Sequence, residues 1–281
     1  MLVTGGGLAG LCAALEAANA GAEVTLLEKL TECGGSSVLS GGLLAFSGTD
    51  LQKAAGISDN ETLLYDDLRR AGQYQNVEAL VRTYVANQMA AYQWLLKLGT
   101  KFISVELAAG HSAPRAHSLR SQDFMALMER RAREAGVNIV FDAAAERPLR
   151  SSVDGRVEGV TAQLNGKATN IRARRGVVLA AGGFARNAEL VNLFVPHQAK
   201  CVVYCGAGCS GDGVRMACAL ARDCAMWSTS KAPLAFIRIQ AKRRDATGVS
   251  ARCVATALCV TVRTKTSAAP GFHRATANSS S

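Results

Sequence analysis

The feature that most constrains the fold is a cluster of glycines close to the start of the sequence, Gly5, Gly7 and Gly10. A short apolar run at residues 2–4 precedes the cluster, and a stretch rich in Ala and Leu, both strong helix formers, follows at 11–20. Residues 23–27 then form a nearly continuous apolar run, which is typical of a buried parallel strand. The chain is therefore predicted to begin with a strand, a turn, a helix and a second strand parallel to the first.

The spacing of these glycines, Gly-x-Gly-x-x-Gly, has a mechanical meaning. The first glycine permits the tight turn, the second lets the backbone approach a pyrophosphate, and the third lets the helix pack closely on the strand. The pyrophosphate then meets the free N–H groups and the positive dipole end of the helix. Glu28 ends the second strand, where an acid accepts a hydrogen bond from a ribose hydroxyl. This context favours a dinucleotide site over a purely structural turn with a surface Glu.

A second loop of small residues follows Glu28 and Lys29. It contains Gly35 and Ser36, and then the run from Ser40 through Gly41 to Gly42. Hydroxyl and amide groups in such a loop can surround a cofactor longer than NAD. The alternative is a flexible loop with no ligand.

The rest of the pattern predicts helices near 60–64 and over 76–98 and 122–135, and strands over 138–141 and 176–180. Leu80, Tyr84, Met89, Trp94 and Leu95 are expected to form an apolar core-facing stripe on the second helix. Asn165-Gly166 lies between two strand-like runs, 157–162 and 168–172, which indicates a β-hairpin. A turn into a helix is expected over 210–220. The predicted fold is α/β: a Rossmann-like domain with a parallel sheet, a helical segment and a small β-hairpin addition.

Several motifs, in order, resemble one family. They are Glu-Lys and Gly-Gly-x-Ser followed by a small-Gly-Gly loop, the segments 110–115 and 180–184, and Gly211-Asp212-Gly213. Together they are similar to the FAD-binding flavoproteins that include fumarate reductases, succinate dehydrogenases and 3-ketosteroid dehydrogenases. The resemblance covers roughly residues 2–221 and is strongest to the soluble fumarate-reductase-like branch.

This resemblance implies FAD as the cofactor and a set of residues that bind it. Ala9 and Gly10 would face the pyrophosphate, Glu28 the adenosine ribose, and the backbone near Ala145 the adenine, while Asp212 would lie near the flavin end. The full implied set is Gly5, Gly7, Ala9, Gly10, Glu28, Lys29, Gly35, Ser36, Ser40, Gly41, Gly42, Ala145, Ala181, Gly182 and Asp212.

The implied activity is that of an FAD-dependent oxidoreductase acting on a C–C bond, with a small-molecule substrate such as a dicarboxylate or a ketone. Two alternatives stay open: a 3-ketosteroid dehydrogenase-like activity, and a non-catalytic FAD-binding remnant. The sequence does not indicate the electron donor or acceptor. His111 and Arg115 are weak catalytic candidates, because an Arg can pair bidentately with a substrate carboxylate. A surface loop with a structural ion pair is the favoured alternative for that segment.

The cysteine content indicates a reducing compartment. No secretory signal or membrane-spanning apolar run is recognisable, so the nine cysteines are expected to be mostly reduced and the protein cytoplasmic. Cys201, Cys205 and Cys209 are spaced four apart, but the intervening glycines disfavour one helix face carrying all three. We favour unrelated thiols over a metal or iron–sulfur site and predict no metal.

The net charge of +10 is concentrated at the C-terminal end, where residues 226–281 hold nine Lys or Arg and one acidic residue. We predict an incomplete FAD-binding domain over 1–224 and a divergent, disordered basic tail over 225–281, because no capping domain of the family is recognisable after about Cys224. The tail is either a basic extension that binds nucleic acid or an acidic partner, or the end of a truncated or frame-shifted chain. The second is favoured, since the tail lacks interleaved aromatic residues, and no nucleic-acid partner is expected.

Overall fold

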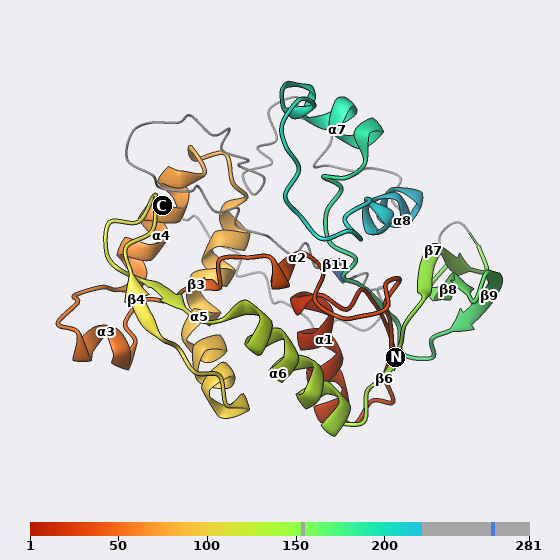
Figure 1. Cartoon of the computed structure of the whole chain (residues 1–281), viewed down its shortest axis with the longest axis horizontal. Coiled ribbons are helices and arrows are strands. Elements are labelled where there is room, and N and C mark those ends of the chain that lie inside the picture. The colour runs from red at the N-terminus through yellow and green to blue at the C-terminus, as the bar shows by residue number, and fades with distance from the viewer. Residues whose placement is uncertain (153–154, 221–259, 262–281) are drawn as a thin grey trace, which may run out of the picture.

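The central element is a five-stranded sheet with the strand order β11-β10-β1-β2-β6 (Figure 1). The computed structural model describes residues 1–152 and 155–220, and the backbone alone of 260–261. Strands β10, β1, β2 and β6 are parallel, and β11 is antiparallel to β10. The strand bounds are Leu2–Thr4 (β1), Thr25–Leu27 (β2), Asn138–Val140 (β6), Val177–Leu179 (β10) and Val260–Thr261 (β11). The predicted parallel α/β sheet is confirmed.

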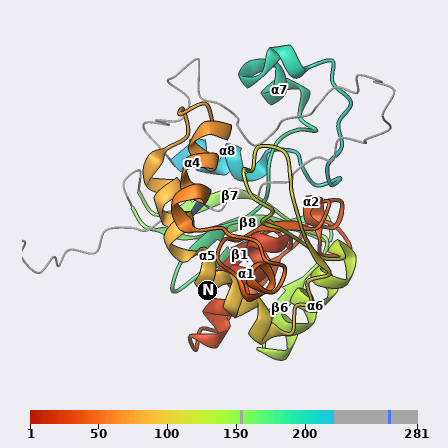
Figure 2. The ribbon, with the colours of Figure 1, turned by 90° about the vertical axis from the view of Figure 1, so that its left-hand side faces the viewer.

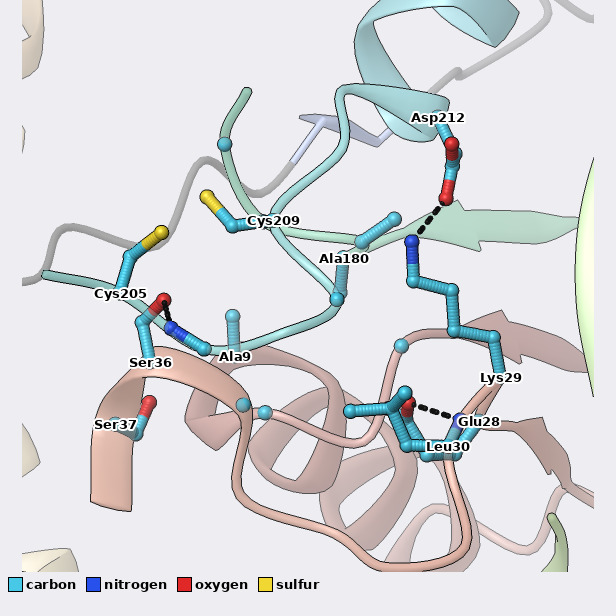
Figure 3. Close-up of a pocket in the computed structure, with 18 of the residues that line it drawn as sticks. Ala9, Glu28, Lys29, Leu30, Ser36, Ser37, Ala180, Cys205, Cys209 and Asp212 are labelled. Carbon is cyan, nitrogen blue, oxygen red and sulfur yellow. Dashed lines mark hydrogen bonds and ion pairs between the residues drawn. The ribbon is translucent and has the colours of Figure 1, made fainter. Parts of the chain in front are cut away.

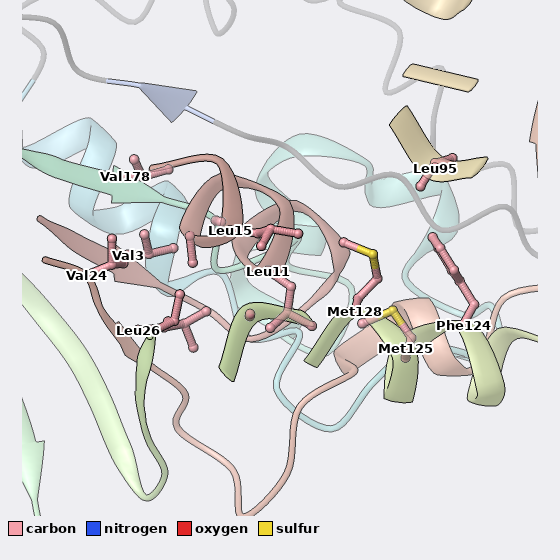
Figure 4. Packing of buried hydrophobic residues seen from close by; sticks show 14 of the residues in the cluster. Val3, Leu11, Leu15, Val24, Leu26, Leu95, Phe124, Met125, Met128 and Val178 are labelled. Atoms are coloured by element: carbon pink, nitrogen blue, oxygen red, sulfur yellow. The ribbon is translucent and has the colours of Figure 1, made fainter. Parts of the chain in front are cut away.

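Helices α1 (Leu8–Asn19) and α6 (Ser121–Glu134) pack against each other beside this sheet. Their apolar side chains share one buried cluster with those of β1, β2 and β10 (Figure 4). Leu11 and Met128 are fully enclosed in it. A Cβ on Gly10 would lie 1.8 Å from the Gly5 carbonyl oxygen, so α1 can approach the first turn this closely only because Gly10 has no side chain.

The β-hairpin addition forms a separate three-stranded sheet at one side of the molecule (Figure 1). It contains β7 (Ala143–Arg150), β8 (Val157–Leu164) and β9 (Lys167–Arg172). Asn165 and Gly166 have φ values of 51° and 75°, as a type I′ turn between β8 and β9 requires. The hairpin prediction is confirmed, and β7 is an additional strand, whose sequence has little apolar alternation.

The opposite side of the molecule holds a third small sheet and three helices (Figure 1). The sheet order is β3-β5-β4. The bounds are Leu43–Ala45 (β3), Ser104–Glu106 (β4), Ala116–Ser118 (β5), Asp50–Ala54 (α3), Glu61–Ala71 (α4) and Glu78–Leu98 (α5).

Helix α5 shows an error in the predicted apolar stripe. Leu80 is 65% exposed and Tyr84 41% exposed, whereas Val81 and Val85 are buried. The buried face also contains Gln88, whose side chain hydrogen-bonds the backbone of Ser47. The stripe was predicted on the wrong face at its start because a buried, hydrogen-bonded Gln interrupts the apolar pattern.

Four short elements complete the described part of the chain, and Figure 2 shows α7 at the top of the view with α8 below it. They are α2 (Gly35–Val38), α7 (Ala188–Phe194), the 3-10 helix η1 (Pro196–Gln198) and α8 (Asp212–Leu220). Among the residues that the structure describes, no helix has both the length and the apolar character needed to cross a membrane.

Candidate functional site

A pocket lies at the carboxyl ends of β1, β2 and β10, next to the start of α1 (Figure 3). Its free space is about 1370 Å³, including the open mouth. In open α/β sheets, ligands bind outside the carboxyl ends of the strands, so the fold places this pocket where a cofactor is expected.

The pocket brings together most of the residues that the sequence predicts to bind the cofactor. The predicted residues that line it are Gly5, Gly7, Ala9, Glu28, Lys29, Gly35, Ser36, Ser40, Ala145, Ala181, Gly182 and Asp212. Gly10, Gly41 and Gly42 are not among the lining residues. Gly42 has a packing reason of its own, since a Cβ there would lie 2.1 Å from the Leu119 carbonyl oxygen.

The three glycines of the Gly-x-Gly-x-x-Gly motif differ in which contacts require the absence of a side chain. A Cβ on Gly5 would come within 2.4 Å of the Ala180 carbonyl oxygen, and Gly5 has a φ of +99°. Gly10 is required by the close contact with Gly5. Gly7, in contrast, has ordinary extended backbone, and a Cβ there would meet nothing nearer than 3.9 Å. Protein packing therefore requires Gly5 and Gly10, whereas at Gly7 it leaves space free beside the pocket.

The N-terminus of α1 has few side-chain acceptors for its backbone N–H groups. Gly7 is the N-cap residue and has no side chain that could cap the helix. Leu8 N–H donates to Ser37 Oγ at 3.3 Å, and Leu11 N–H makes the first intrahelical bond, to the Gly7 carbonyl. N–H groups in the first turn have no intrahelical acceptor and carry the positive end of the helix dipole, which suits a phosphate group.

Glu28 is anchored at the end of β2 by two backbone groups. Its Oε2 accepts a hydrogen bond from Gly6 N–H at 2.6 Å, and its Oε1 accepts one from Leu30 N–H at 2.9 Å. The residue is 7% exposed and lines the pocket. Because each carboxylate oxygen has a second lone pair, the anchored group retains acceptor capacity for a ribose hydroxyl.

Lys29 connects the end of β2 to the start of α8 across the pocket (Figure 3). Its Nζ lies 2.5 Å from Asp212 Oδ2 and also donates to Ser210 Oγ. The Lys29 and Asp212 side chains are 25% and 31% exposed. The two predicted site residues are therefore paired with each other in this structure.

The sequence prediction missed the part of the pocket formed by Tyr204, Cys205, Gly206, Gly208 and Cys209. Gly206 N–H donates to Ser36 Oγ at 3.1 Å, and a Cβ on Gly206 would lie 2.6 Å from the Gly35 carbonyl carbon. Gly206 and Gly208 are the sequence feature that could have indicated a close approach of this turn to the pocket. Cys201, Cys205 and Cys209 lie outside any helix, and no group of His, Cys, Asp or Glu within the described ranges is arranged to hold a metal.

His111 and Arg115 do not line this pocket. Arg115 is fully buried, and its guanidinium pairs with Asp59 at 2.7 Å and with Asp67 at 2.6 Å. Burial raises the pKa of Asp67, but hydrogen bonds from Ser112 and Arg115 outweigh it and hold that pKa below the usual range. The structural ion pair that the sequence favoured for Arg115 is present, but Arg115 is buried, so the expectation of a surface loop there was wrong.

The fold and the pocket define a Rossmann-like dinucleotide-binding protein. A family model described as the FAD binding domain matches residues 1–254, and the chain belongs to this family. FAD is the family's cofactor, so the predicted family and its cofactor are confirmed.

Relatives and solved structures of flavin enzymes resemble the chain. It is 28% identical to an NADH:fumarate oxidoreductase of Klebsiella pneumoniae (strain 342), over 77% of this chain and 24% of that protein. It is 29% identical to a fumarate reductase (cytochrome) of Shewanella frigidimarina, over 77% and 39%. A 3-ketosteroid-Δ4-(5α)-dehydrogenase from Rhodococcus jostii RHA1 has a TM-score of 0.75 at 28% identity, over 79% of this chain and 53% of that one. An open-conformation flavocytochrome c3 fumarate reductase has a TM-score of 0.74 at 28% identity, over 78% and 40%. The chain thus spans less than half the length of these curated relatives.

Proposed function

We propose that the pocket holds FAD with its pyrophosphate at the N-terminus of α1 and its adenosine ribose at Glu28. The observation that carries this proposal is Gly7, because its Cα borders the pocket where packing alone would permit a side chain. The glycine at the N-cap of α1 supports the same placement, because it has no side chain that would compete for the helix N–H groups. We assign Ala145 to the adenine side, Ala181 and Gly182 to the cover of the cofactor, and Asp212 to the flavin side.

The proposed activity is that of an FAD-dependent oxidoreductase domain acting on an activated C–C bond of a small molecule. Bound FAD supplies the hydride transfer, and the chain's own residues bind and orient it. The named relatives support two substrate classes, dicarboxylates and 3-ketosteroids. A flavin-binding role without catalysis is a second candidate, because Lys29 is the sole Lys or Arg that lines the pocket in the described part of the chain, and it is paired with Asp212. An unpaired cation is what stabilises a substrate carboxylate during reduction.

The test uses the purified full chain loaded with FAD. We expect one FAD per chain, measured by its absorbance after gel filtration, and loss of that FAD in Gly7→Val. Absence of a stoichiometric flavin in the wild-type chain would contradict the cofactor site.

The second step separates the candidate activities. The bound flavin is reduced chemically without oxygen, and its reoxidation is followed after addition of fumarate or 4-androstene-3,17-dione, with free reduced FAD as the control. Acceleration by fumarate supports the dicarboxylate class, and acceleration by the steroid supports the ketone class. No acceleration by either supports the binding role alone.

A further inference from the structure

The turn that covers one edge of the pocket carries two cysteines close together. Cys205 and Cys209 both line the pocket, and Figure 3 shows their side chains beside each other above Ser36. Both are partly buried thiols. Burial, together with the neighbouring, hydrogen-bonded thiol of Cys209, raises the pKa of Cys205 to about 11.

The backbone of this turn suits a short covalent link. Cys209 N–H donates to the Gly206 carbonyl at 3.1 Å, so the chain reverses between the two cysteines. Gly206 and Gly208 lie inside the turn, and glycine accepts the small dihedral changes that a disulfide's specific geometry demands.

We propose that Cys205 and Cys209 are a modification site that forms a reversible intrachain disulfide by exchange with a small-molecule disulfide of the glutathione class. One thiolate attacks the small disulfide, giving a mixed disulfide and releasing one small thiol. The second thiolate attacks the protein sulfur of the mixed disulfide and releases the other small thiol. Two protein thiols are thereby oxidised to one disulfide, and the small disulfide is reduced to two thiols.

A disulfide between Cys205 and Cys209 would affect the wall of the pocket, because hydrogen bonds already hold this turn against that wall. Gly206 N–H bonds to Ser36, and the Arg186 guanidinium donates to the Cys205 carbonyl at 3.0 Å. A disulfide would hold these contacts together by restricting the turn. The raised pKa of Cys205 keeps its thiolate scarce at neutral pH, so its part in the exchange is slow.

The experiment treats the purified full chain with oxidised glutathione, blocks remaining thiols with iodoacetamide and digests with trypsin. Cleavage after Lys200 and Arg215 yields one peptide containing Cys201, Cys205 and Cys209. We expect this peptide to lose two hydrogens, with Cys201 alkylated, and to return to three alkylated cysteines after reduction with dithiothreitol. Fragmentation assigns the pair.

The matched variants are Cys205→Ser and Cys209→Ser, which should abolish the internal disulfide, and Cys201→Ser, which should retain it. Serine is close in size to cysteine, so all three are expected to fold. Three outcomes would each overturn the proposal. They are a disulfide that includes Cys201, glutathione adducts without an intrachain disulfide, and three unmodified thiols. Both cysteines line the pocket, so the reaction is run on the chain freed of FAD, where failure of this proposal is distinguishable from failure of the cofactor site.

Discussion

Two regions that the sequence predicts to be functional differ in whether their polar groups are already paired within the protein. The segment around Arg115 contains an imidazole, a hydroxyl and a guanidinium, yet its guanidinium is consumed by Asp59 and Asp67 inside the protein. The turn around Gly7 contains no charged side chain, yet it borders the pocket, and its N-cap glycine has no side chain to cap α1.

The contrast shows that many polar and charged side chains in one segment do not by themselves predict a functional site. Charged side chains find partners during folding, and a buried guanidinium between two carboxylates is stable only when all of its partners are present. A glycine that packing does not require is more informative, because some other constraint must explain the missing side chain. The two regions should therefore respond oppositely to mutation.

The largest expected effect is on stability at Arg115. Arg115→Ala would leave two buried carboxylates without their cation, at a cost of about 3–5 kcal/mol in the free energy of unfolding. Urea unfolding followed by circular dichroism measures it, with the milder Arg115→Lys as a second variant. Arg120→Ala is the control, because Arg120 is 79% exposed and 3.6 Å from Asp123, and it should change stability by less than about 0.5 kcal/mol. A stable Arg115→Ala chain with impaired flavin chemistry would return Arg115 to the list of catalytic candidates.

The next effect is on cofactor affinity at Gly7. Gly7→Val should weaken FAD binding by about 100-fold or more, which is about 2.7 kcal/mol, while leaving the unfolding midpoint nearly unchanged. Gly10→Val should do the reverse and destabilise the fold, because its Cβ meets the Gly5 carbonyl oxygen at 1.8 Å. Flavin fluorescence titration and thermal unfolding of both variants give the comparison. Equal FAD affinity in wild type and Gly7→Val would make this turn purely structural.

A smaller effect is expected at Glu28, which has both a structural and a proposed binding role. Glu28→Ala should reduce FAD affinity by about 1.5–3 kcal/mol, since a hydrogen bond involving a charged group is lost. It should also lower stability, because Gly6 N–H and Leu30 N–H lose their acceptor. Glu32→Ala, at a nearby exposed position, is the control for both measurements. Matching dissociation constants for the two variants would remove the ribose assignment.

The sequence predicted those features that depend on residues close together in the chain, and it missed those that depend on contacts between distant segments. The first strand, the helix after it and the Asn165-Gly166 turn follow from local backbone requirements, and all were predicted. The buried Gln88 and the partners of Arg115 depend on contacts between distant segments, which periodicity does not reveal. The Cys205–Cys209 turn was missed as part of the pocket for the same reason, since only the fold brings Gly206 against Gly35. The proposed roles of the lining residues stay predictions until a ligand is measured.

The smallest expected effect is at the Lys29–Asp212 pair, and it tests whether residues at the pocket can be structural in the way that Arg115 is. The two side chains are a quarter to a third exposed, so their attraction is partly screened by water and should contribute about 1 kcal/mol or less to stability. Lys29→Met removes the ammonium but keeps much of the apolar stem, and Asp212→Asn removes the opposite charge while preserving shape. If the two residues only fasten α8 to the end of β2, both single variants and the double variant should lose the same small stability, and FAD affinity should change less than about fivefold, which is about 1 kcal/mol. If Lys29 instead contacts the cofactor once FAD enters, Lys29→Met alone should weaken binding by more than that, with a loss that shrinks at high salt. Isothermal titration at two salt concentrations distinguishes these outcomes.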